Sequence, residues 1–185
     1  YAGRKAAEWA RTVDFTEPDA AEIDREEERL YAPMYVEDGM DWRELNMAIS
    51  KCMQNYCGAV KNEELLREGL SLLESYKRDA VPQLSCANPH DLMRTHEVLD
   101  ILEVSTLILN ACLLRKSSSA PLCFERSDYP EMDPAEDKKF ITIRQENGKI
   151  IRGEVQHRYF GDIEEEYIKR NGDYIDERAT KYGDR

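Results

Sequence analysis

The sequence lacks the features that several large classes of protein require. No apolar run approaches the roughly 20 residues of a membrane span, and the longest, Val104 to Leu114, is interrupted by Ser105, Thr106 and Asn110. Positive charge is also scarce, because 26 Lys and Arg stand against 38 Asp and Glu and leave a net charge of −12. Such a surface is poorly suited to nucleic acid phosphates or to an anionic membrane. We therefore expect no nucleic acid partner and no direct membrane insertion.

Residues with the usual spacing of reactive sites are equally scarce. The five cysteines are odd in number and none belongs to a C-x-x-C pair, and the three histidines are scattered. This usage argues against a disulfide framework and a zinc site, and it favours a reducing cytoplasm. The sequence contains no glycine-rich phosphate loop and no nucleophile elbow. A free-standing enzyme is therefore not expected.

Three isolated candidates for chemistry each have a simpler interpretation. The acidic run Glu26 to Glu28 could form an acid/base cluster, but a solvated helix face is the favoured interpretation. His96 could carry protons in a cleft, although a locally hydrogen-bonded histidine at a helix edge is more frequent. Cys123 lies in an expected loop, where Arg126 is the only nearby cation. It is the thiol that we would test for reactivity.

One segment, residues 88–116, organises the rest of the chain. Asn88 is a natural N-cap, Pro89 suits the first helical turn, and Asp91 places negative charge near the positive end of the helix dipole. Apolar residues recur at three- and four-residue steps and also fill the adjoining rows. We predict a central helix that is buried on most of its circumference.

Further helices are predicted upstream, over residues 3–12 and 17–34. Asp41 should then cap a helix that ends near Gly58, and Asn62 should cap one that ends at Pro82. Short loops between three successive amphipathic helices imply antiparallel neighbours. The predicted fold is mainly α: an up-down-up, spectrin-repeat-like three-helix bundle with a C-terminal β-hairpin and an extended tail.

The hairpin is predicted at about residues 140–156. Phe140 to Gln145 alternates apolar and polar residues, and Asn147-Gly148 is the preferred pair for a type I′ turn. One side of the first strand is apolar and needs cover. From Gly161 the tail is acidic and then mixed, and we expect it to be partly disordered without a partner.

A loop between the central helix and the hairpin carries Arg126, Asp128, Tyr129 and Pro130. Arginine offers bidentate pairing and tyrosine a large amphipathic contact, so this loop could clamp onto a neighbour. Alternatively, Asp128 caps its own turn and Arg126 is a surface charge. The residues alone do not separate these two interpretations.

The stretch RKSSSAPLCFERSDYPEMD, Arg115 to Asp133, follows a long apolar helix and resembles the R-x-E-S-R…R-x-D-Y-P region of the fumarate reductase / succinate dehydrogenase flavoprotein family. The opening GRKAAEWA resembles the last helix of that family's FAD domain. Within the family, the spacing looks most similar to adenylylsulfate reductase α-subunits. The chain departs from the pattern at Ser117 and Ser119, where the family has Glu and Arg, and keeps Ser118.

The resemblance implies the C-terminal helical domain of a flavoprotein oxidoreductase subunit that takes part in electron transfer. Residues 1–38 would then be the end of an upstream FAD domain and a connecting helix, residues 39–116 the bundle, and residues 117–185 the loop, hairpin and tail. Because the chain opens with Tyr1 rather than Met, we expect it to be part of a longer polypeptide. FAD and the catalytic residues would belong to the upstream part.

Several expectations about this chain follow from that resemblance. It should contain no catalytic, cofactor-binding or metal-binding residue and should be inactive alone. Its partners would be the FAD and capping domains and an iron–sulfur subunit, with Arg126, Asp128 and Tyr129 as interdomain contacts. The location would be the cytoplasm, with peripheral membrane association through partner subunits as an option. The alternative function is a self-contained helical interaction module whose hairpin and tail capture a partner.

Overall fold

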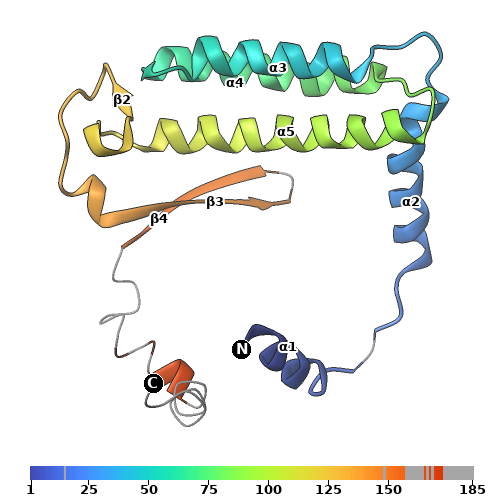
Figure 1. Ribbon diagram of the computed structural model, residues 1–185, viewed down its shortest axis with the longest axis horizontal. Coiled ribbons are helices and arrows are strands. Elements are labelled where there is room, and N and C mark those ends of the chain that lie inside the picture. Colours follow the sequence, from blue (N-terminus) through green and yellow to red (C-terminus); the bar gives the residue numbers. More distant parts are fainter. Residues whose placement is uncertain (15, 148, 157–164, 166, 168, 173–185) are drawn as a thin grey trace, which may run out of the picture. The chain divides into compact units, whose positions relative to one another are not determined.

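The computed structural model describes residues 1–14, 16–147, 149–156, 165, 167 and 169–172 (Figure 1). Over these residues the chain is mostly helical and carries one antiparallel β-hairpin near its C-terminal end, as predicted. A compact unit of residues 24–156 contains the long helices and the hairpin, and a second unit contains α1 (Ala2–Ala10). In the described part of the chain, no helix combines the length and apolar character that crossing a membrane requires.

Each of the three long helices begins at the cap that the sequence predicts. Asp41 accepts a hydrogen bond from the Arg43 backbone N–H at 2.7 Å at the start of α3 (Trp42–Tyr56). Asn62 accepts from Leu65 N–H at 2.9 Å at the start of α4 (Glu63–Ser75). Asn88 accepts from Asp91 N–H at 3.0 Å at the start of α5 (Pro89–Leu114). These bonds satisfy backbone donors that a helix N-terminus otherwise leaves unpaired.

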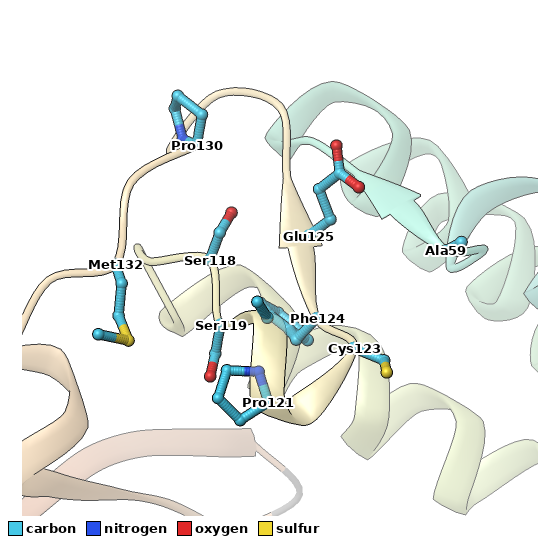
Figure 2. A pocket seen from close by; sticks show the side chains of 10 residues that line it. Ala59, Ser118, Ser119, Pro121, Cys123, Phe124, Glu125, Pro130 and Met132 are labelled. Atoms are coloured by element: carbon cyan, nitrogen blue, oxygen red, sulfur yellow. The ribbon is translucent and has the colours of Figure 1, made fainter.

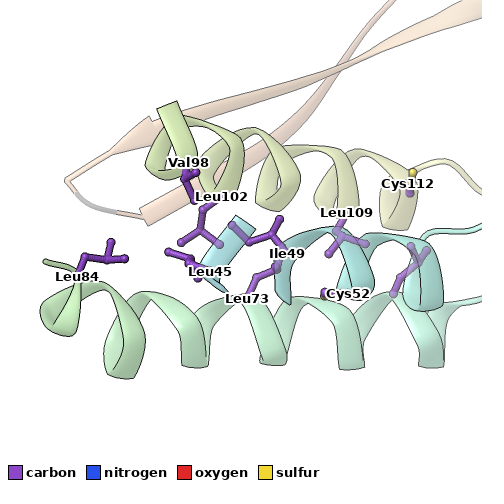
Figure 3. Close-up of a cluster of buried hydrophobic side chains, with 10 residues drawn as sticks. Leu45, Ile49, Cys52, Leu73, Leu84, Val98, Leu102, Leu109 and Cys112 are labelled. Atoms are coloured by element: carbon purple, nitrogen blue, oxygen red, sulfur yellow. The ribbon is translucent and has the colours of Figure 1, made fainter. Parts of the chain in front are cut away.

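The hydrophobic core lies between α3, α4 and α5, which pack pairwise on one another (Figure 3). Its members are the buried apolar residues Leu45, Ile49, Cys52, Leu66, Leu73, Leu84, Val98, Leu102, Leu109 and Cys112. Gly69 allows α4 to approach its neighbours closely, because a Cβ atom there would lie 2.8 Å from the Tyr56 Cβ and 3.3 Å from the Leu109 side chain. A glycine is therefore required at this contact by packing.

The exposed side of α5 differs from the prediction. Besides the charged residues Glu97, Asp100 and Glu103, the apolar residues Ile101, Val104 and Ile108 are also exposed, at 44%, 52% and 42%. They follow one another at steps of three and four residues and share one face of the helix. The prediction of burial on most of the circumference was wrong for this face, because nothing in the described residues covers it. α5 thus presents one apolar face to the core and another to solvent.

Two other helix boundaries depend on local structure. α3 ends at Tyr56, close to the predicted end near Gly58, and Val60 lies beyond it in the short strand β1 (Val60–Lys61), half exposed. The helix expected from residue 17 begins as α2 (Ala20–Tyr31), where Asp19 accepts a hydrogen bond from Ala21 N–H at 3.0 Å. It is followed by the 3-10 turn η1 (Ala32–Tyr35). These helix boundaries therefore follow local capping and strand pairing rather than the periodicity of the apolar residues.

The connection from α4 to α5 is irregular but tied down. α4 continues into a π-helical turn (Tyr76–Ala80) and a 3-10 turn (Val81–Gln83), and Pro82 lies where the helical path ends, as predicted. Met40 N–H then donates to Gln83 O at 2.6 Å, and Ser85 N–H donates to Met40 O at 3.0 Å. These bonds hold the chain that enters α3 against the chain that leaves α4.

The hairpin consists of β3 (Lys139–Glu146) and β4 (Lys149–Gln156), and β3 lies against α5. Ile143 pairs with Arg152 across the strands, and the Arg152 Nε–H donates to the buried Asn110 Oδ1 of α5 at 2.9 Å. Asn147 has the positive φ of 50° that a tight turn requires. α5 therefore covers the half-buried side of the hairpin that Ile141 and Ile143 form. The tail predicted to be partly disordered lies mostly outside the described residues.

Adjacent residues of α5 should respond very differently to truncation. Leu109→Ala should lower the free energy of unfolding by about 2–5 kcal/mol, because it removes a fully buried side chain. Ile108→Ala should cost less than about 1 kcal/mol in the same chain, because that side chain already meets solvent. Urea unfolding of both variants measures the difference. Equal losses would show that the two faces of α5 are not distinct as described.

Candidate functional site

The loop that follows α5 is fastened to the connection between α3 and α4. Its strand β2 (Glu125–Arg126) pairs in parallel with β1, so that Arg126 lies opposite Lys61. Ser127 N–H extends this pairing by donating to Lys61 O at 2.8 Å. Residues that are far apart in sequence are thus held side by side at one end of the packed helices (Figure 1). No sequence pattern indicated this pairing, because each strand has only two residues.

Arg126 lies at the centre of the loop, and its side chain is completely buried. Its Nε and Nη2 donate to the two carboxylate oxygens of Asp128 at 2.8 and 2.7 Å, in the bidentate geometry that suits a guanidinium. Its Nη1 donates to the backbone oxygens of Cys112 and Arg115, the latter at 2.8 Å. The interpretation of Arg126 as a surface charge is therefore wrong. Its guanidinium satisfies carbonyls that the C-terminus of α5 leaves without a partner.

Asp128 connects this arrangement to a second helix. One carboxylate oxygen accepts from Glu63 N–H at 2.9 Å, at the first residue of α4. The hydrogen bonds from Arg126 lower the pKa of Asp128 to about 2, with the Glu63 N–H contributing in the same direction. A carboxylate at a helix N-terminus is also favoured by the helix dipole. Asp128 thus caps a helix 65 residues earlier in the chain.

Three consecutive serines precede the loop and take part in its hydrogen bonds. Ser117, Ser118 and Ser119 are all buried. The Ser118 hydroxyl accepts from Arg126 N–H at 2.8 Å and donates to Tyr129 O at 2.8 Å, and Ser117 Oγ accepts from the N–H of Asp133 at 2.9 Å. The sequence comparison identified Ser117 and Ser119 as departures from the family pattern and Ser118 as a match to it. A run of short hydroxyl side chains before a proline was the available signal, since such residues bond to nearby backbone.

Tyr129 completes the group of residues that the sequence proposed as a contact. The Arg126 guanidinium lies 5.1 Å from the centre of the Tyr129 ring, and Tyr129 N–H donates to Arg126 O at 3.1 Å. The structure therefore brings Arg126, Asp128 and Tyr129 into one network. Whether they contact another domain stays a prediction. Gly3 and Arg4, the other positions that match family motifs, lie in α1 within the other unit.

A cavity of about 670 Å³ lies beside this network (Figure 2). Ser118, Ser119, Phe124, Pro121 and Met132 contribute to its mostly apolar lining. Cys123 stands at this cavity with a left-handed φ of 50° and an exposed side chain. Of the lining residues, only Cys123 and Glu125 are ionisable, and no general acid and base converge on a common point there. The cavity suits an apolar side chain better than it suits catalysis.

The remaining candidates have structural environments. Glu26 pairs with Arg29 on the exposed surface of α2, as expected for a solvated helix face. The His96 ring Nε2 lies 2.8 Å from Leu30 O, so its partner is 66 residues away rather than local. Over the described residues, no group of three or more His, Cys, Asp and Glu side chains could hold a metal ion. All five cysteines are free thiols.

Packed helices, a loop fastened by a buried arginine and a small hairpin define a mostly helical domain, and the described residues contain no complete catalytic constellation. Comparison with known protein families identifies the family to which this domain belongs. The family described as "Fumarate reductase flavoprotein C-term" matches residues 46–160. The chain belongs to this C-terminal domain family of the fumarate reductase flavoproteins, as the resemblance implied.

Individual relatives agree with this assignment. The chain is 27% identical, over 86% of its length, to the fumarate reductase flavoprotein subunit of Haemophilus influenzae. Its fold is similar to adenylylsulfate reductase from Archaeoglobus fulgidus, with a TM-score of 0.72, 22% identity and 77% of this chain covered. It is also similar to Sdh1 of Mycobacterium smegmatis, with a TM-score of 0.71, 21% identity and 83% covered.

The chain spans only part of these relatives. It covers 30% of the Haemophilus influenzae subunit, 25% of the Archaeoglobus fulgidus chain and 26% of the Mycobacterium smegmatis chain. Similarity at 22% and 21% identity concerns the fold. The activity, substrate and partners of a whole protein are therefore matters for a proposal.

Removing the buried guanidinium should destabilise the fold strongly. Arg126→Ala should cost about 3–5 kcal/mol, because it leaves a cavity and removes the partner of Asp128 and of two carbonyls. The matched control is Arg144→Ala, whose ion pair with Glu146 is exposed and should be worth no more than about 1 kcal/mol. Chemical denaturation of both variants gives these free energies. A cost for Arg126→Ala as small as the control's would contradict the central position of Arg126.

The Asp128 carboxylate predicts a specific dependence of stability on pH. Because the folded pKa of about 2 lies below the model-compound value of 3.8, its contribution is complete above pH 3.8 and is lost as pH falls through about 2. The full shift would correspond to roughly 2 kcal/mol, and because Asp128 is exposed to solvent, screening reduces its contribution to about 1 kcal/mol. Asp128→Asn should therefore be less stable than the unaltered chain at neutral pH, and this gap should shrink in acid. Measuring both chains cancels the effects of other carboxylates, and a gap that does not change with pH would refute the assignment.

Proposed function

We propose that this chain is the C-terminal helical domain of an FAD-dependent oxidoreductase subunit, in which it braces the FAD and capping domains and contacts a partner subunit. The observation that carries the proposal is the exposed apolar row of α5, formed by Ile101, Val104 and Ile108. Family membership supports the flavoprotein context, and the small share of each relative that the chain covers leaves room for the upstream domains. The assigned role is structural.

The apolar row is suited to permanent contact with a neighbouring domain. Three β-branched side chains at steps of three and four residues form a continuous strip on a rigid helix. Burying the exposed half of each side chain would contribute roughly 1 kcal/mol. The opposite face of α5 is anchored in the core through Leu102 and Leu109, so the strip cannot turn inward without unpacking the fold. This face is our first candidate interdomain contact.

The loop residues 126–130 are our second candidate contact. Since the Arg126 side chain is buried, its role would be to fix the conformation of the loop. The half-buried Tyr129 and the neighbouring cavity would form the surface that contacts the other domain. Asp128 would fix the position of this loop on α4. In this arrangement the three predicted interdomain residues have different roles, and only Tyr129 offers contact surface.

FAD is assigned to the upstream part of the protein. Binding of a dinucleotide usually requires a glycine-rich turn between a strand and a helix of a parallel sheet. The sequence contains no G-x-G-x-x-G motif. Parallel pairing in the described residues is limited to the two-residue strands β1 and β2 and an isolated bridge between Met40 and Leu84. These residues do not fit the cofactor, so we assign no step of flavin chemistry to them.

The finer architecture is part of the same proposal. Residues 39–116 would form an up-down-up, spectrin-repeat-like bundle, residues 1–38 would end the FAD domain and connect it to the bundle, and residues 117–185 would supply loop, hairpin and tail. An iron–sulfur subunit is the proposed partner for electron transfer. The whole protein would work in the cytoplasm, either free or peripherally bound to a membrane through other subunits.

A self-contained interaction module is the second candidate function. The hairpin favours it, because β3 and β4 pair only with each other among the described residues and each leaves one edge open. An extended partner segment could add a strand there. The coding sequence upstream of Tyr1 separates the candidates: a G-x-G-x-x-G motif several hundred residues earlier supports the flavoprotein subunit, and an unrelated upstream region supports the module.

A charge placed in the apolar row should act only in the longer protein. Val104→Glu should change the stability of the isolated chain by less than about 0.5 kcal/mol, because that side chain meets solvent. In the full-length polypeptide the same change should lower the melting temperature and the flavin retained per chain, because it would bury a charge. Met47→Glu is the control, since Met47 is an exposed apolar residue of α3. Equal effects of both changes in the full-length protein would contradict the proposed contact.

A further inference from the structure

Two thiols from different helices lie next to each other below the Arg126 loop. Cys57 follows the last residue of α3, Cys112 lies in the last turn of α5, and their sulfur atoms are 3.9 Å apart. At this distance the two sulfurs are in contact, and disulfide formation requires them to approach further, to about 2.05 Å. Cys57 is half-buried and Cys112 is nearly buried, so a small reagent from solvent would meet Cys57 first.

The charges around the pair favour ionisation of Cys57. The Cys112 thiol hydrogen bond and the charge of Lys61 lower the pKa of Cys57 to about 7, whereas the same hydrogen bond and burial raise the pKa of Cys112. Lys61 belongs to β1, is only 8% exposed, and stands 4.9 Å over the Phe124 ring. Its Nζ donates to Ala59 O at 3.3 Å, and among the described residues it forms no ion pair with a carboxylate, so a Cys57 thiolate would supply it with a counter-charge. The other ionisable groups that interact with the pair are Arg126 of β2, beside Cys112, and the buried Cys52 of α3.

We propose that Cys57 and Cys112 form a peroxide-reactive dithiol that closes reversibly into a disulfide. The Cys57 thiolate attacks one oxygen of a hydroperoxide, the O–O bond breaks, and the departing hydroxide or alkoxide takes up a proton. The product is a sulfenic acid on Cys57. The Cys112 sulfur then attacks the Cys57 sulfur, the S–O bond breaks, and the sulfenic oxygen leaves as water with the Cys112 proton. With hydrogen peroxide, two thiols are oxidised and two waters form.

The other cysteines lack this combination. Cys52 is buried and its thiol donates to Gly69 O at 3.5 Å, and Cys86 is buried with its sulfur 3.1 Å from the Thr95 hydroxyl. Cys123 is exposed but has no second thiol in its surroundings among the residues that line the adjacent cavity. Among the five cysteines, only Cys57 combines access to solvent, a nearby cation and a second thiol that can react with a sulfenic acid.

The disulfide would bear directly on the loop described above. It would join the ends of α3 and α5, and the backbone oxygen of Cys112 already accepts a hydrogen bond from Arg126. The oxidation state of the Cys57–Cys112 pair would therefore change how rigidly the end of α5, to which Arg126 is bonded, is held against α3. This inference does not depend on the flavoprotein assignment.

Peptide mapping of the oxidised chain tests the proposal. The reduced 185-residue chain is treated with one equivalent of hydrogen peroxide, remaining thiols are blocked, and disulfide-linked peptides are identified by mass spectrometry. We expect a Cys57–Cys112 link that dithiothreitol removes, and a rate of formation that rises with pH through about 7. Cys112→Ser should instead accumulate a sulfenic acid at Cys57 that a diketone probe labels. Cys123→Ser, the matched control, should leave the link unchanged.

The same chain unfolded in urea provides the reference for the native geometry. The Cys57–Cys112 link should form at least roughly tenfold more slowly there, because unfolding separates the two thiols and removes Lys61 from the neighbourhood of Cys57. The proposal is overturned if native and unfolded chains form the link at equal rates. It is also overturned if peroxide oxidises Cys123 while the pair stays reduced.

Discussion

Burial of the Arg126 guanidinium is the constraint on which the rest of this structure depends. A charged group without solvent is tolerated only when its donors are paired, and here Asp128 and two carbonyls at the end of α5 supply the partners. Asp128 in turn caps α4. One ion pair therefore connects the C-terminus of α5 and the N-terminus of α4 to the loop that leads from α5 to the hairpin. The serines before the loop and the β1–β2 pairing then follow, because the backbone around Arg126 must also be satisfied.

Helix α5 has two different apolar faces. The first packs into the core between α3 and α4, and the second carries Ile101, Val104 and Ile108 into solvent. An exposed apolar strip favours association with another surface. The stability of this domain alone therefore does not explain the second face. The proposed role of this face is contact with a neighbouring domain of the same protein. A rigid helix, anchored on one side and apolar on the other, is well suited to bracing a neighbouring domain.

The parts of the fold that could be predicted are those encoded over short distances. Asp41, Asn62 and Asn88 cap helices within three residues of themselves, and alternation before Asn147 predicts a hairpin. The role of Arg126 could not be predicted, because its environment combines a carbonyl 14 residues earlier with a carboxylate that caps a distant helix. Val104 falls within the apolar periodicity of α5, yet that periodicity cannot distinguish the face that packs in the core from the face that meets solvent.

Side-chain footprinting measures the exposure of that second face most directly. Hydroxyl radicals modify accessible side chains, so Ile101, Val104 and Ile108 can be followed in the isolated chain and in the full-length polypeptide. The bracing role predicts ready modification of all three in the isolated chain and strong protection in the longer protein, while Met47 on α3 reacts equally in both. Equal modification of the three residues in both forms would contradict it.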